Sequence, residues 1–520
     1  MVRVNNPIMA GFYPDPSVCR VGKYYYMVHS TFAYYPGVPI FRSENLADWE
    51  QIGNILDRDS QLPLTGCRQS EGIFAPTIRY YQGMFYMITT NITAGEVENN
   101  FIVTAKTPEG PWSEPYYLGH EARGIDPSLF FDTDGTCYYI GQRRKCGAKY
   151  FGDCEIWIQK LNLQTMKLEE EAVPVLDGFQ KNAVWPEGPH LYYKDGYYYI
   201  IHAESGTEFC HSVMVARGRN IFGPYEYCPM NPVITHRHLG RDYPVTCVGH
   251  ADLVDDGSGN WYMVMLACRP QNGHTLLGRE TFLAKVVWED GWPVVNPGVG
   301  HLEETFEIPG EADTVQHYDE CRSYTFDRQD IPQEFLSLRN NREKIMSLTD
   351  RLGYLRLYMR ADTLKDLAEP AYLAVRQQHQ NYMVETDLHI CFGNGNGCAG
   401  VALMQNDENH VRVECFREDN KEGIRVVQSV HGLDNELCST ECSETEKKGL
   451  KIYVYGLRAD VWFRLNENWQ LLISKINIES LSTEIAGGFV GCTVGMYASG
   501  NGEDTGGYAD FASFTYRGLQ

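Results

Sequence analysis

A short phrase recurs five times within the first 300 residues, roughly every fifty to sixty positions. Each copy has a short apolar segment, a turn containing glycine and an aromatic-rich segment, which is the pattern of a β-hairpin. The copies begin at Asp15-Pro-Ser, Ala75-Pro-Thr, Asp126-Pro-Ser, Glu187-Gly-Pro-His and His250-Ala-Asp. A hairpin repeat of this period is typical of a radial β-architecture, in which equivalent positions of successive blades meet at the axis. The repeat therefore predicts a five-bladed β-propeller in which Asp15, Asp126 and Glu187 converge on one place.

The rest of the chain predicts a second domain that is also built from strands, since 520 residues are too many for one ordinary core. Residues 303–322 are acidic and lose the periodicity, as expected for a linker. Beyond them, segments such as 382–390 and 460–465 alternate or nearly alternate, as half-buried antiparallel strands do. The predicted organisation is all-β: a propeller over residues 1–302, the linker, and a β-sandwich over residues 323–520.

Composition limits the classes of partner. A net charge of −23 leaves no basic stripe for a nucleic acid backbone or an anionic membrane surface, so we expect a neutral substrate or none. No apolar run has the length of a membrane span or a signal peptide, which predicts a soluble protein of the cytoplasm. The 16 cysteines lack zinc-site spacing and are expected to be reduced thiols. The large second domain offers surface for self-association as a homo-oligomer.

Some of the aspartates are explained by local structure. Asp134, Asp195 and Asp256 each precede glycine in a predicted turn, where the carboxylate bonds its own backbone. Asp15 and Asp126 differ, because each precedes proline at the start of an apolar strand, where there is no turn to stabilise. A single Asp-Pro-Ser would be consistent with loop initiation, whereas two copies at matching positions favour a chemical role.

Three carboxylates in one pocket indicate acid–base chemistry on a glycosidic bond. Glycoside hydrolases use a protonated carboxyl group to protonate the leaving oxygen and an ionised one on the opposite face of the sugar. Glu187 lies in the stiff loop Trp185-Pro-Glu-Gly-Pro-His, where an aromatic neighbour and a nearby carboxylate would raise its pKa. We therefore predict Glu187 as the general acid and Asp15 as the general base. Asp126 would set the pKa of the acid and position it.

Four further residues are candidates for holding the sugar or the pocket. Phe32 and Phe74 are predicted to form an aromatic wall against which a sugar stacks, with a place in the core as the alternative. Arg279 would donate to ring hydroxyls through its fork of N–H groups, or else form an ordinary salt bridge at a blade edge. His250 replaces the acid in the fifth copy, and is either a core histidine or an axial residue that holds the pocket or a bound cation.

The motifs around these residues resemble one family of enzymes. Asn6-Pro-Ile-Met-Ala-Gly-Phe-Tyr-Pro-Asp-Pro-Ser, Gly124-Ile-Asp-Pro-Ser-Leu-Phe-Phe-Asp and Trp185-Pro-Glu-Gly-Pro-His-Leu-Tyr closely resemble the family 43 glycoside hydrolases. The likeness is to the β-xylosidase and α-L-arabinofuranosidase group in particular. Arg376-Gln-Gln-His resembles part of that group's C-terminal concanavalin-like jelly roll, so the resemblance spans nearly the whole chain.

The resemblance implies a five-bladed propeller with an inverting mechanism, and the same roles for Asp15, Asp126 and Glu187. An inverting enzyme needs room for a water molecule, so its two carboxyl groups should lie about 6.5 to 9.5 Å apart. His250 falls on the family's axial histidine, which in several members is associated with a calcium ion or a water cluster. No cofactor is required, and a structural Ca²⁺ in the propeller channel is the one metal that the resemblance suggests.

The resemblance also bears on the walls of the pocket. Arg279 falls on a substrate-contacting arginine, and Phe74 stands where many relatives carry tryptophan. Relatives place a loop of the sandwich over the pocket rim, so residues 376–379 are expected to help close the site.

The expected activity is the exo-acting release of terminal pentose, β-D-xylose or α-L-arabinofuranose, from oligosaccharides. The sequence does not separate the two sugars, because they present similar hydroxyl patterns. A non-catalytic sugar-binding propeller is the alternative from another class. A fructan-acting five-bladed hydrolase is disfavoured, because its Asn-Asp-Pro-Asn and Glu-Cys motifs are absent from the five repeats.

Overall fold

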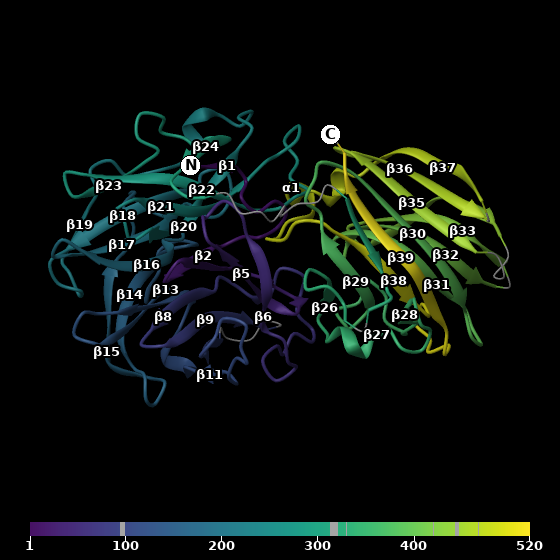
Figure 1. Cartoon of the computed structure of the whole chain (residues 1–520), viewed down its shortest axis with the longest axis horizontal. Coiled ribbons are helices and arrows are strands. Elements are labelled where there is room, and N and C mark those ends of the chain that lie inside the picture. The colour runs from purple at the N-terminus through teal and green to yellow at the C-terminus, as the bar shows by residue number, and fades with distance from the viewer. Residues whose placement is uncertain are drawn as a thin grey trace.

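The computed structural model describes residues 1–93, 99–311, 321–328, 330–419, 421–442, 447–465 and 467–519. Two β-domains lie side by side, with the N-terminal half of the chain in one and the C-terminal half in the other (Figure 1). The described helices are short: they are α1 (Thr483–Ala486) and the 3-10 turns η1 (Gly119–Glu121), η2 (Arg237–Leu239), η3 (Arg342–Lys344) and η4 (Glu479–Leu481). The all-β prediction is confirmed.

The N-terminal domain is a five-bladed propeller whose blades are antiparallel sheets. The strands of each blade follow chain order, and the first full strands of the five blades contact one another around the axis. The blades are β2 (Ser17–Val21), β3 (Tyr24–Val28), β5 (Gly37–Ser43) and β6 (Glu50–Leu56); β7 (Gly72–Ile73), β8 (Thr77–Tyr81), β9 (Met84–Ile92), β10 (Asn99–Ala105) and β11 (Tyr116–Tyr117); β12 (Ile125–Phe131), β13 (Cys137–Arg144), β14 (Cys154–Asn162) and β15 (Lys167–Leu176); β16 (Glu187–Lys194), β17 (Tyr197–Glu204), β18 (Ser212–Gly218) and β19 (Tyr225–Tyr227); β20 (Thr246–Asp255), β21 (Trp261–Cys268), β22 (Glu280–Glu289) and β23 (Trp292–Val295).

The sequence repeat corresponds to the first hairpin of each blade. Gly22 and Gly196 occupy the hairpin turns with φ of 63° and 79°, a backbone region that favours glycine. The aromatic segment that follows becomes the second strand, which in β3 and β17 is largely buried between neighbouring blades. The hairpin prediction is therefore confirmed in both its turn and its buried second strand.

The C-terminal domain is a sandwich of two sheets around one apolar core, to which Leu373, Val401 and Phe514 belong. One sheet has the order β27-β28-β39-β30-β35-β36-β37, with β25 also paired to β39, and the other has the order β34-β33-β32-β31-β38-β29-β26-β4. The strands are β25 (Cys321–Thr325), β26 (Leu336–Leu338), β27 (Met346–Ser347), β28 (Leu355–Tyr358), β29 (Ala371–Arg376), β30 (Asn381–Cys391), β31 (Gly397–Asn406), β32 (Asn409–Glu418), β33 (Lys421–Val430), β34 (Leu433–Glu441), β35 (Lys448–Tyr455), β36 (Arg458–Leu465), β37 (Asn468–Asn477), β38 (Thr493–Ser499) and β39 (Tyr508–Gly518).

The two domains share a sheet and a core. Strand β4 (Tyr34–Tyr35) belongs to the propeller segment of the chain, yet it pairs with β26 and so extends a sheet of the sandwich. One apolar cluster joins Phe12 and Tyr34 of the propeller to Leu336 and Tyr372 of the sandwich. Because the two domains share a sheet and an apolar cluster, the contact between them belongs to the folded core of the protein.

The predicted linker over residues 303–322 contains strand structure. Strand β24 (Thr305–Ile308) pairs with β1 (Val2–Asn5), and β25 begins at Cys321. Residues 312–320 lie outside the described residues. The acidic residues around β24 concealed its alternation, in which Phe306 and Ile308 are buried while Thr305 and Glu307 are exposed.

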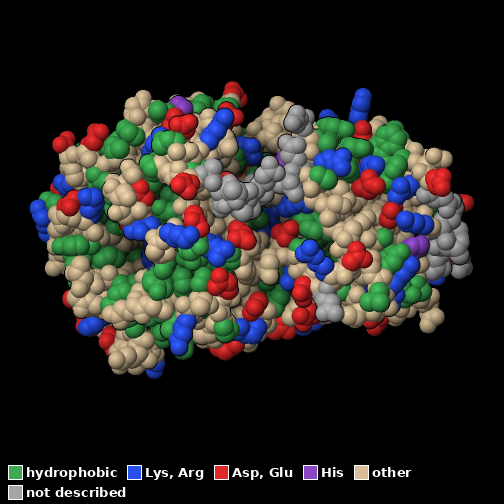
Figure 2. Space-filling view, in the orientation of Figure 1, with side chains coloured by type: hydrophobic (Ala, Val, Ile, Leu, Met, Phe, Trp, Pro, Cys, Tyr) green, Lys and Arg blue, Asp and Glu red, His purple; other side chains and the backbone are tan. Residues whose placement is uncertain are grey.

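Acidic and basic side chains are interspersed over the face shown in Figure 2, across both domains. Among the described residues, no helix has the length and apolar character needed to cross a membrane.

Candidate active site

One cavity at the propeller axis brings together all seven side chains that the sequence singled out. The cavity has a volume of about 70 Å³. Its lining consists of Asp15, Phe32, Phe74, Ala75, Ile125, Asp126, Glu187, Thr207, His250, Arg279 and Phe489. The convergence of blades at the axis thus places carboxylates from the first, third and fourth repeats in one small pocket.

Irregularities in the innermost strands aim these residues at the pocket. The pairing of β12 with β13 shifts between Ile125 and Ser128, so Asp126 falls in a bulge, and a similar shift follows Glu187 in β16. Asp15 and Asp126 have φ of 53° and 54°, an uncommon conformation for residues other than glycine. Bulges and strained backbone of this kind re-aim side chains beside active sites. The proline after each aspartate suits this position because it has no N–H to contribute to the sheet.

Asp15 is buried but lies among hydrogen-bond donors. The Arg279 guanidinium donates to both its oxygens, at 2.9 and 3.4 Å, and the Ser30 hydroxyl donates to Oδ2 at 2.5 Å. His250 Nδ1 lies 3.7 Å from Oδ1. Burial by itself would raise the pKa of Asp15. Three contacts outweigh it and hold the pKa below its usual value: the positive charge of Arg279, the neighbouring His250 ring and the hydrogen bond from Ser30. Asp15 is therefore ionised at neutral pH.

Asp126 and Glu187 experience the opposite electrostatic environment. Burial, with the charge of Asp15 as a further cause, raises the pKa of Asp126 to about 6 although Gly188 N donates to Oδ2 at 3.0 Å. Burial and then the neighbouring charges of Asp126 and Asp15 raise the pKa of Glu187 well above its usual value. Trp185, expected beside the acid, is not among the residues that line the cavity. The pocket thus holds an ionised carboxylate in Asp15 and a carboxyl group in Glu187 that retains its proton, as a general base and a general acid require.

Three phenylalanines form an aromatic wall, and one of them comes from the sandwich. The rings of Phe32 and Phe489 are stacked with centroids 6.1 Å apart, and Phe74 meets both edge-on at 5.6 and 6.1 Å. Phe489 follows a turn in which Gly487 and Gly488 have φ of 72° and 83°. A Cβ on Gly488 would lie 2.3 Å from Ser70 Oγ, the atom that accepts a hydrogen bond from Phe489 N. The sequence offers no sign that a phenylalanine so far along the chain reaches this pocket.

Arg279 lies in the pocket as predicted, but its fork binds the protein. Besides Asp15, it donates to Thr207 Oγ1 at 3.2 Å and to the Phe489 carbonyl at 3.3 Å. Its main contact in this structure is therefore with a carboxylate of the pocket, and it connects the propeller to the loop of the sandwich that closes the wall.

The expectation that residues 376–379 help close the site is wrong, because none of them lines the cavity. Arg376 is buried between the domains, where its Nε donates to the Phe12 carbonyl at 2.9 Å, and Gln378 donates to the Ala10 carbonyl at 3.0 Å. These side chains hold the segment that leads to Asp15. The sandwich contributes to the wall through Phe489 instead, whose backbone N–H donates to Ser70 of the propeller.

The pocket residues do not form a metal site from side-chain ligands. No group of three or more His, Cys, Asp or Glu residues within the described ranges is arranged to hold a metal ion. Calcium takes six to eight oxygen ligands, whereas the oxygens of Asp15 already accept hydrogen bonds from Arg279 and Ser30. The ring of His250 packs instead against the backbone of Gly188. It lies so close that a Cβ on Gly188 would be 3.0 Å from the ring.

A larger groove opens beside the pocket and shares part of its lining. The groove has a volume of about 640 Å³ and lies between loops of the fourth and fifth blades and residues 483–489 of the sandwich. Thr207, Arg279 and Phe489 belong to both cavities. A molecule held in the small pocket can therefore extend into the groove.

A five-bladed propeller with an ionised and a protonated carboxyl group in one axial pocket has the arrangement of a glycoside hydrolase. Residues 4–293 match the model of the glycosyl hydrolases family 43, and residues 323–517 match the beta xylosidase C-terminal concanavalin A-like domain. The chain belongs to glycosyl hydrolase family 43, and it is a glycoside hydrolase.

Several relatives are similar along their whole length. A xylosidase/arabinosidase of Butyrivibrio fibrisolvens is 49% identical over 518 residues, which cover 99% of both chains. A non-reducing end alpha-L-arabinofuranosidase of Bacteroides ovatus is 35% identical over 99% of this chain and 94% of that protein. The crystal structure of a xylan beta-1,4-xylosidase from Bacillus halodurans superimposes with a TM-score of 0.91 at 32% identity, over 99% of this chain and 100% of that one. Nothing in the site or in these relatives supports the alternative of a non-catalytic sugar-binding propeller.

Proposed function

We propose that this protein is an inverting, exo-acting glycoside hydrolase that releases terminal β-D-xylose, α-L-arabinofuranose or both from oligosaccharides. The observation that carries the proposal is the contrast between Asp15 and Glu187, which share one pocket but are held in opposite protonation states. The names of the relatives support a pentoside as substrate, and they include both sugars.

In the proposed reaction, Asp15 accepts one proton and Glu187 donates one. Asp15 accepts a proton from a water molecule as the water oxygen forms a bond to the anomeric carbon. Glu187 donates its proton to the glycosidic oxygen as the bond from that oxygen to the anomeric carbon breaks. The products are a sugar of inverted anomeric configuration and an alcohol, and both carboxyl groups recover their starting states by exchanging a proton with solvent.

The two cavities suggest how the substrate lies. The small axial pocket is lined by the carboxyl groups and the aromatic wall, and the groove leads away from it at Thr207 and Arg279. The leaving part of the substrate would occupy the groove, which favours cleavage at a chain end.

We also propose that the protein acts in the cytoplasm. No cysteine of the described residues forms a disulfide, and Cys146, Cys210 and Cys321 are exposed. This supports a reducing compartment such as the cytoplasm, where imported oligosaccharides would be the substrate.

Matched aryl glycosides test the proposal. Purified protein should hydrolyse nitrophenyl β-D-xylopyranoside, nitrophenyl α-L-arabinofuranoside or both, and it should release only terminal sugar from xylo- and arabino-oligosaccharides. Binding without turnover of any pentoside would contradict the proposal, as would release of internal fragments from insoluble xylan. Proton NMR of the first-formed sugar decides the stereochemistry, since inversion yields the anomer opposite to that of the substrate.

Two amide variants separate the roles of the acid and the base. Glu187→Gln should lower kcat on an oligosaccharide by about 10²- to 10⁴-fold, with a smaller loss on a nitrophenyl glycoside, whose leaving group departs without a proton. Asp15→Asn should lower kcat by a similar factor on both substrates. Glu226→Gln, which changes an exposed acid of the fourth blade, is the matched control. Near-normal turnover in either pocket variant would refute its assignment.

A further inference from the structure

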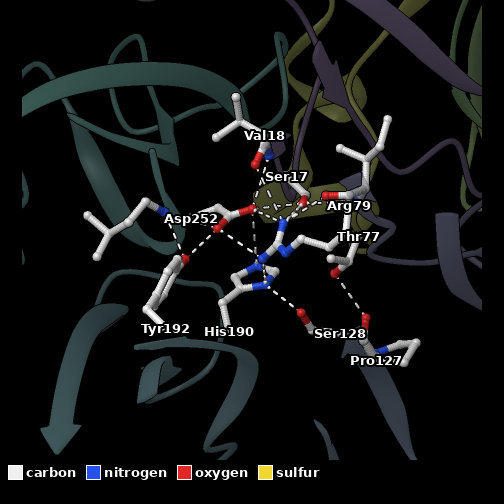
Figure 3. A network of polar contacts seen from close by, with 11 residues as sticks. Ser17, Val18, Thr77, Arg79, Pro127, Ser128, His190, Tyr192 and Asp252 are labelled. Carbon is white, nitrogen blue, oxygen red and sulfur yellow. Dashed lines mark hydrogen bonds and ion pairs between the residues drawn. The ribbon is translucent and has the colours of Figure 1, made fainter. Parts of the chain in front are cut away.

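A network of polar side chains fills the propeller axis beneath the pocket, and Arg79 of β8 is its centre (Figure 3). The Arg79 guanidinium donates to both oxygens of Asp252 at 2.9 and 3.2 Å, to Ser17 Oγ at 3.1 Å and to His190 Nδ1 at 3.0 Å. Ser17, His190 and Asp252 come from the innermost strands of the first, fourth and fifth blades. One side chain of the second blade therefore binds three other blades.

The third blade is connected to the same network. Ser128 of β12 donates to His190 Nδ1 at 3.0 Å, and Thr77 of β8 donates to the Pro127 carbonyl at 2.9 Å (Figure 3). All five innermost strands are thus joined by hydrogen bonds or ion pairs on the axis.

The sequence repeat places each network residue close behind a residue of the pocket. In four copies the network residue stands two positions after the pocket residue, and in the fourth copy it stands three positions after. The pairs are Asp15 and Ser17, Ala75 and Thr77, Asp126 and Ser128, Glu187 and His190, and His250 and Asp252.

This short tether lets the network hold the acids in place. Two residues of extended chain reach at most about 7 Å. Pro16 and Pro127 stand between aspartate and serine in the first and third copies, and their rings fix φ. A shift of Ser17 or Ser128 is therefore passed on to Asp15 or Asp126.

The guanidinium is the positive charge of this network. Burial lowers the pKa of His190 to about 3, so its ring is neutral at physiological pH. Arginine has no acceptor, and so His190 Nδ1 accepts the hydrogen bond from Arg79 and the ring proton lies on Nε2. Asp252 is fully buried, which would raise its pKa, but Arg79 outweighs this and keeps the carboxyl group ionised.

The network does not offer calcium a site. The carboxylate of this network is that of Asp252, and both of its oxygens already accept hydrogen bonds. Oδ2 accepts from Ser17 Oγ at 2.8 Å, Val18 N at 3.0 Å and Arg79, while Oδ1 accepts from Tyr192, Leu253 N and Arg79. Calcium requires six to eight oxygen ligands, and a guanidinium within 3 Å of the carboxylate would repel it.

We propose that Arg79 supplies the positive charge at the propeller axis and is a positioning residue for the pocket carboxylates. The axial network keeps these carboxylates in place without a divalent metal ion. The positioning part of this inference rests on the proposed release of terminal pentose, whereas the metal part is independent of it.

Chelation tests the metal part on the wild-type protein. Dialysis against EDTA, followed by addition of Ca²⁺, should change Tm by less than about 1 °C, since a ligand that binds only the folded state would raise it. The turnover of aryl pentosides should be unchanged as well. A fall in Tm or in turnover on chelation, with recovery on addition of Ca²⁺, would overturn the proposal. The Tm comparison remains decisive even if the protein hydrolyses no pentoside, a result that would refute the proposed function instead.

Substitution tests the positioning part. Arg79→Gln should lower kcat about 10- to 100-fold at a temperature where the variant is folded, because displacement of a reacting group by about 1 Å costs up to about 10² in rate. Arg79→Lys keeps the charge but loses the fork, and should lose less. Arg356→Gln is the matched control, because Arg356 forms a similar buried pair with Asp510 in the sandwich, with 16% of its side chain exposed against 15% for Arg79.

The control should lower Tm without lowering kcat of the folded enzyme. If Arg79→Gln does not fold, the double variant Arg79→Ser with Asp252→Ser removes both buried charges and serves in its place. Wild-type kcat in either folded axial variant would overturn the positioning role, as would a loss no larger than that of Arg356→Gln.

Discussion

Replacement of Ser30 by alanine should raise the pKa of Asp15 and move the acidic limb of the pH–rate profile to higher pH. The Ser30 hydroxyl is fully buried and donates to Asp15 Oδ2 at 2.5 Å. Ser30 does not line the cavity, so the substitution leaves the walls of the pocket unchanged. A hydrogen bond to a carboxylate favours the ionised form, and its loss therefore raises the pKa.

The size of the shift follows from the energy of one such bond. A hydrogen bond to a charged group contributes about 1.5 to 3 kcal/mol, and one pKa unit corresponds to about 1.4 kcal/mol. The pKa of Asp15 should therefore rise by about 1 to 2 units. Since the folded-state pKa of Asp15 lies below its unfolded value, ionisation of Asp15 stabilises the fold above about pH 4 and this contribution is lost as pH falls through the folded pKa. The variant should lose part of this stability at neutral pH.

The assay is kcat/KM for an aryl pentoside as a function of pH, because that ratio reports the ionisation of the free enzyme. Ser43→Ala is the control, since Ser43 is buried in the same blade and accepts hydrogen bonds from Asn45 N and Leu46 N at 3.1 and 2.9 Å, away from any pocket acid. It should lower stability without moving the limb.

Ser30 does not lower the pKa of Asp15 if the acidic limb of folded Ser30→Ala stays within about 0.3 pH units of wild type, when a shift of about 1 to 2 units is expected. A shift to lower pH would refute this effect of Ser30 as well, because it would mean that Ser30 favours the protonated form.

Three further outcomes are expected. Asp126→Asn should stabilise the protein at pH 7 by up to about 3 kcal/mol in urea unfolding, because burial and the charge of Asp15 raise the pKa of Asp126 to about 6 and its ionisation therefore costs stability. This gain should vanish at pH 4, where Asp126 is protonated in the folded state, and a gain that persists there would point to another cause. Phe489→Ala should raise KM about 2- to 10-fold through the loss of an aromatic contact, whereas Leu471→Ala, an exposed change on the sandwich, should leave KM unaltered. The wild-type kcat/KM should fall in alkaline solution as Glu187 loses its proton, and an alkaline limb that persists in Glu187→Gln would show that another group is the acid.

Much of the fold was predictable because its signals are local. A glycine in each hairpin turn and a continuous aromatic segment after it suffice to predict five hairpins, and the repeat predicts which residues reach the axis. Strand β24 was missed because four alternating residues in an acidic stretch are too short a signal.

The contacts between distant segments were not predictable from such signals. The partner of Arg279 is Asp15, 264 positions away, and Arg79 pairs with Asp252, 173 positions away. Phe489 reaches the wall only because a glycine turn docks on Ser70. A side chain carries no local mark of a partner brought close by the closure of the propeller.

The chain's own repeat was thus enough to establish a β-propeller with three acids at its axis, because hairpin turns and strand periodicity are properties of neighbouring residues. The protonation states of those acids, the aromatic wall and the axial network arise from the packed molecule. Burial, the approach of Arg279 to Asp15 and the seating of the sandwich on the propeller set them, and each depends on which distant segments the fold brings into contact.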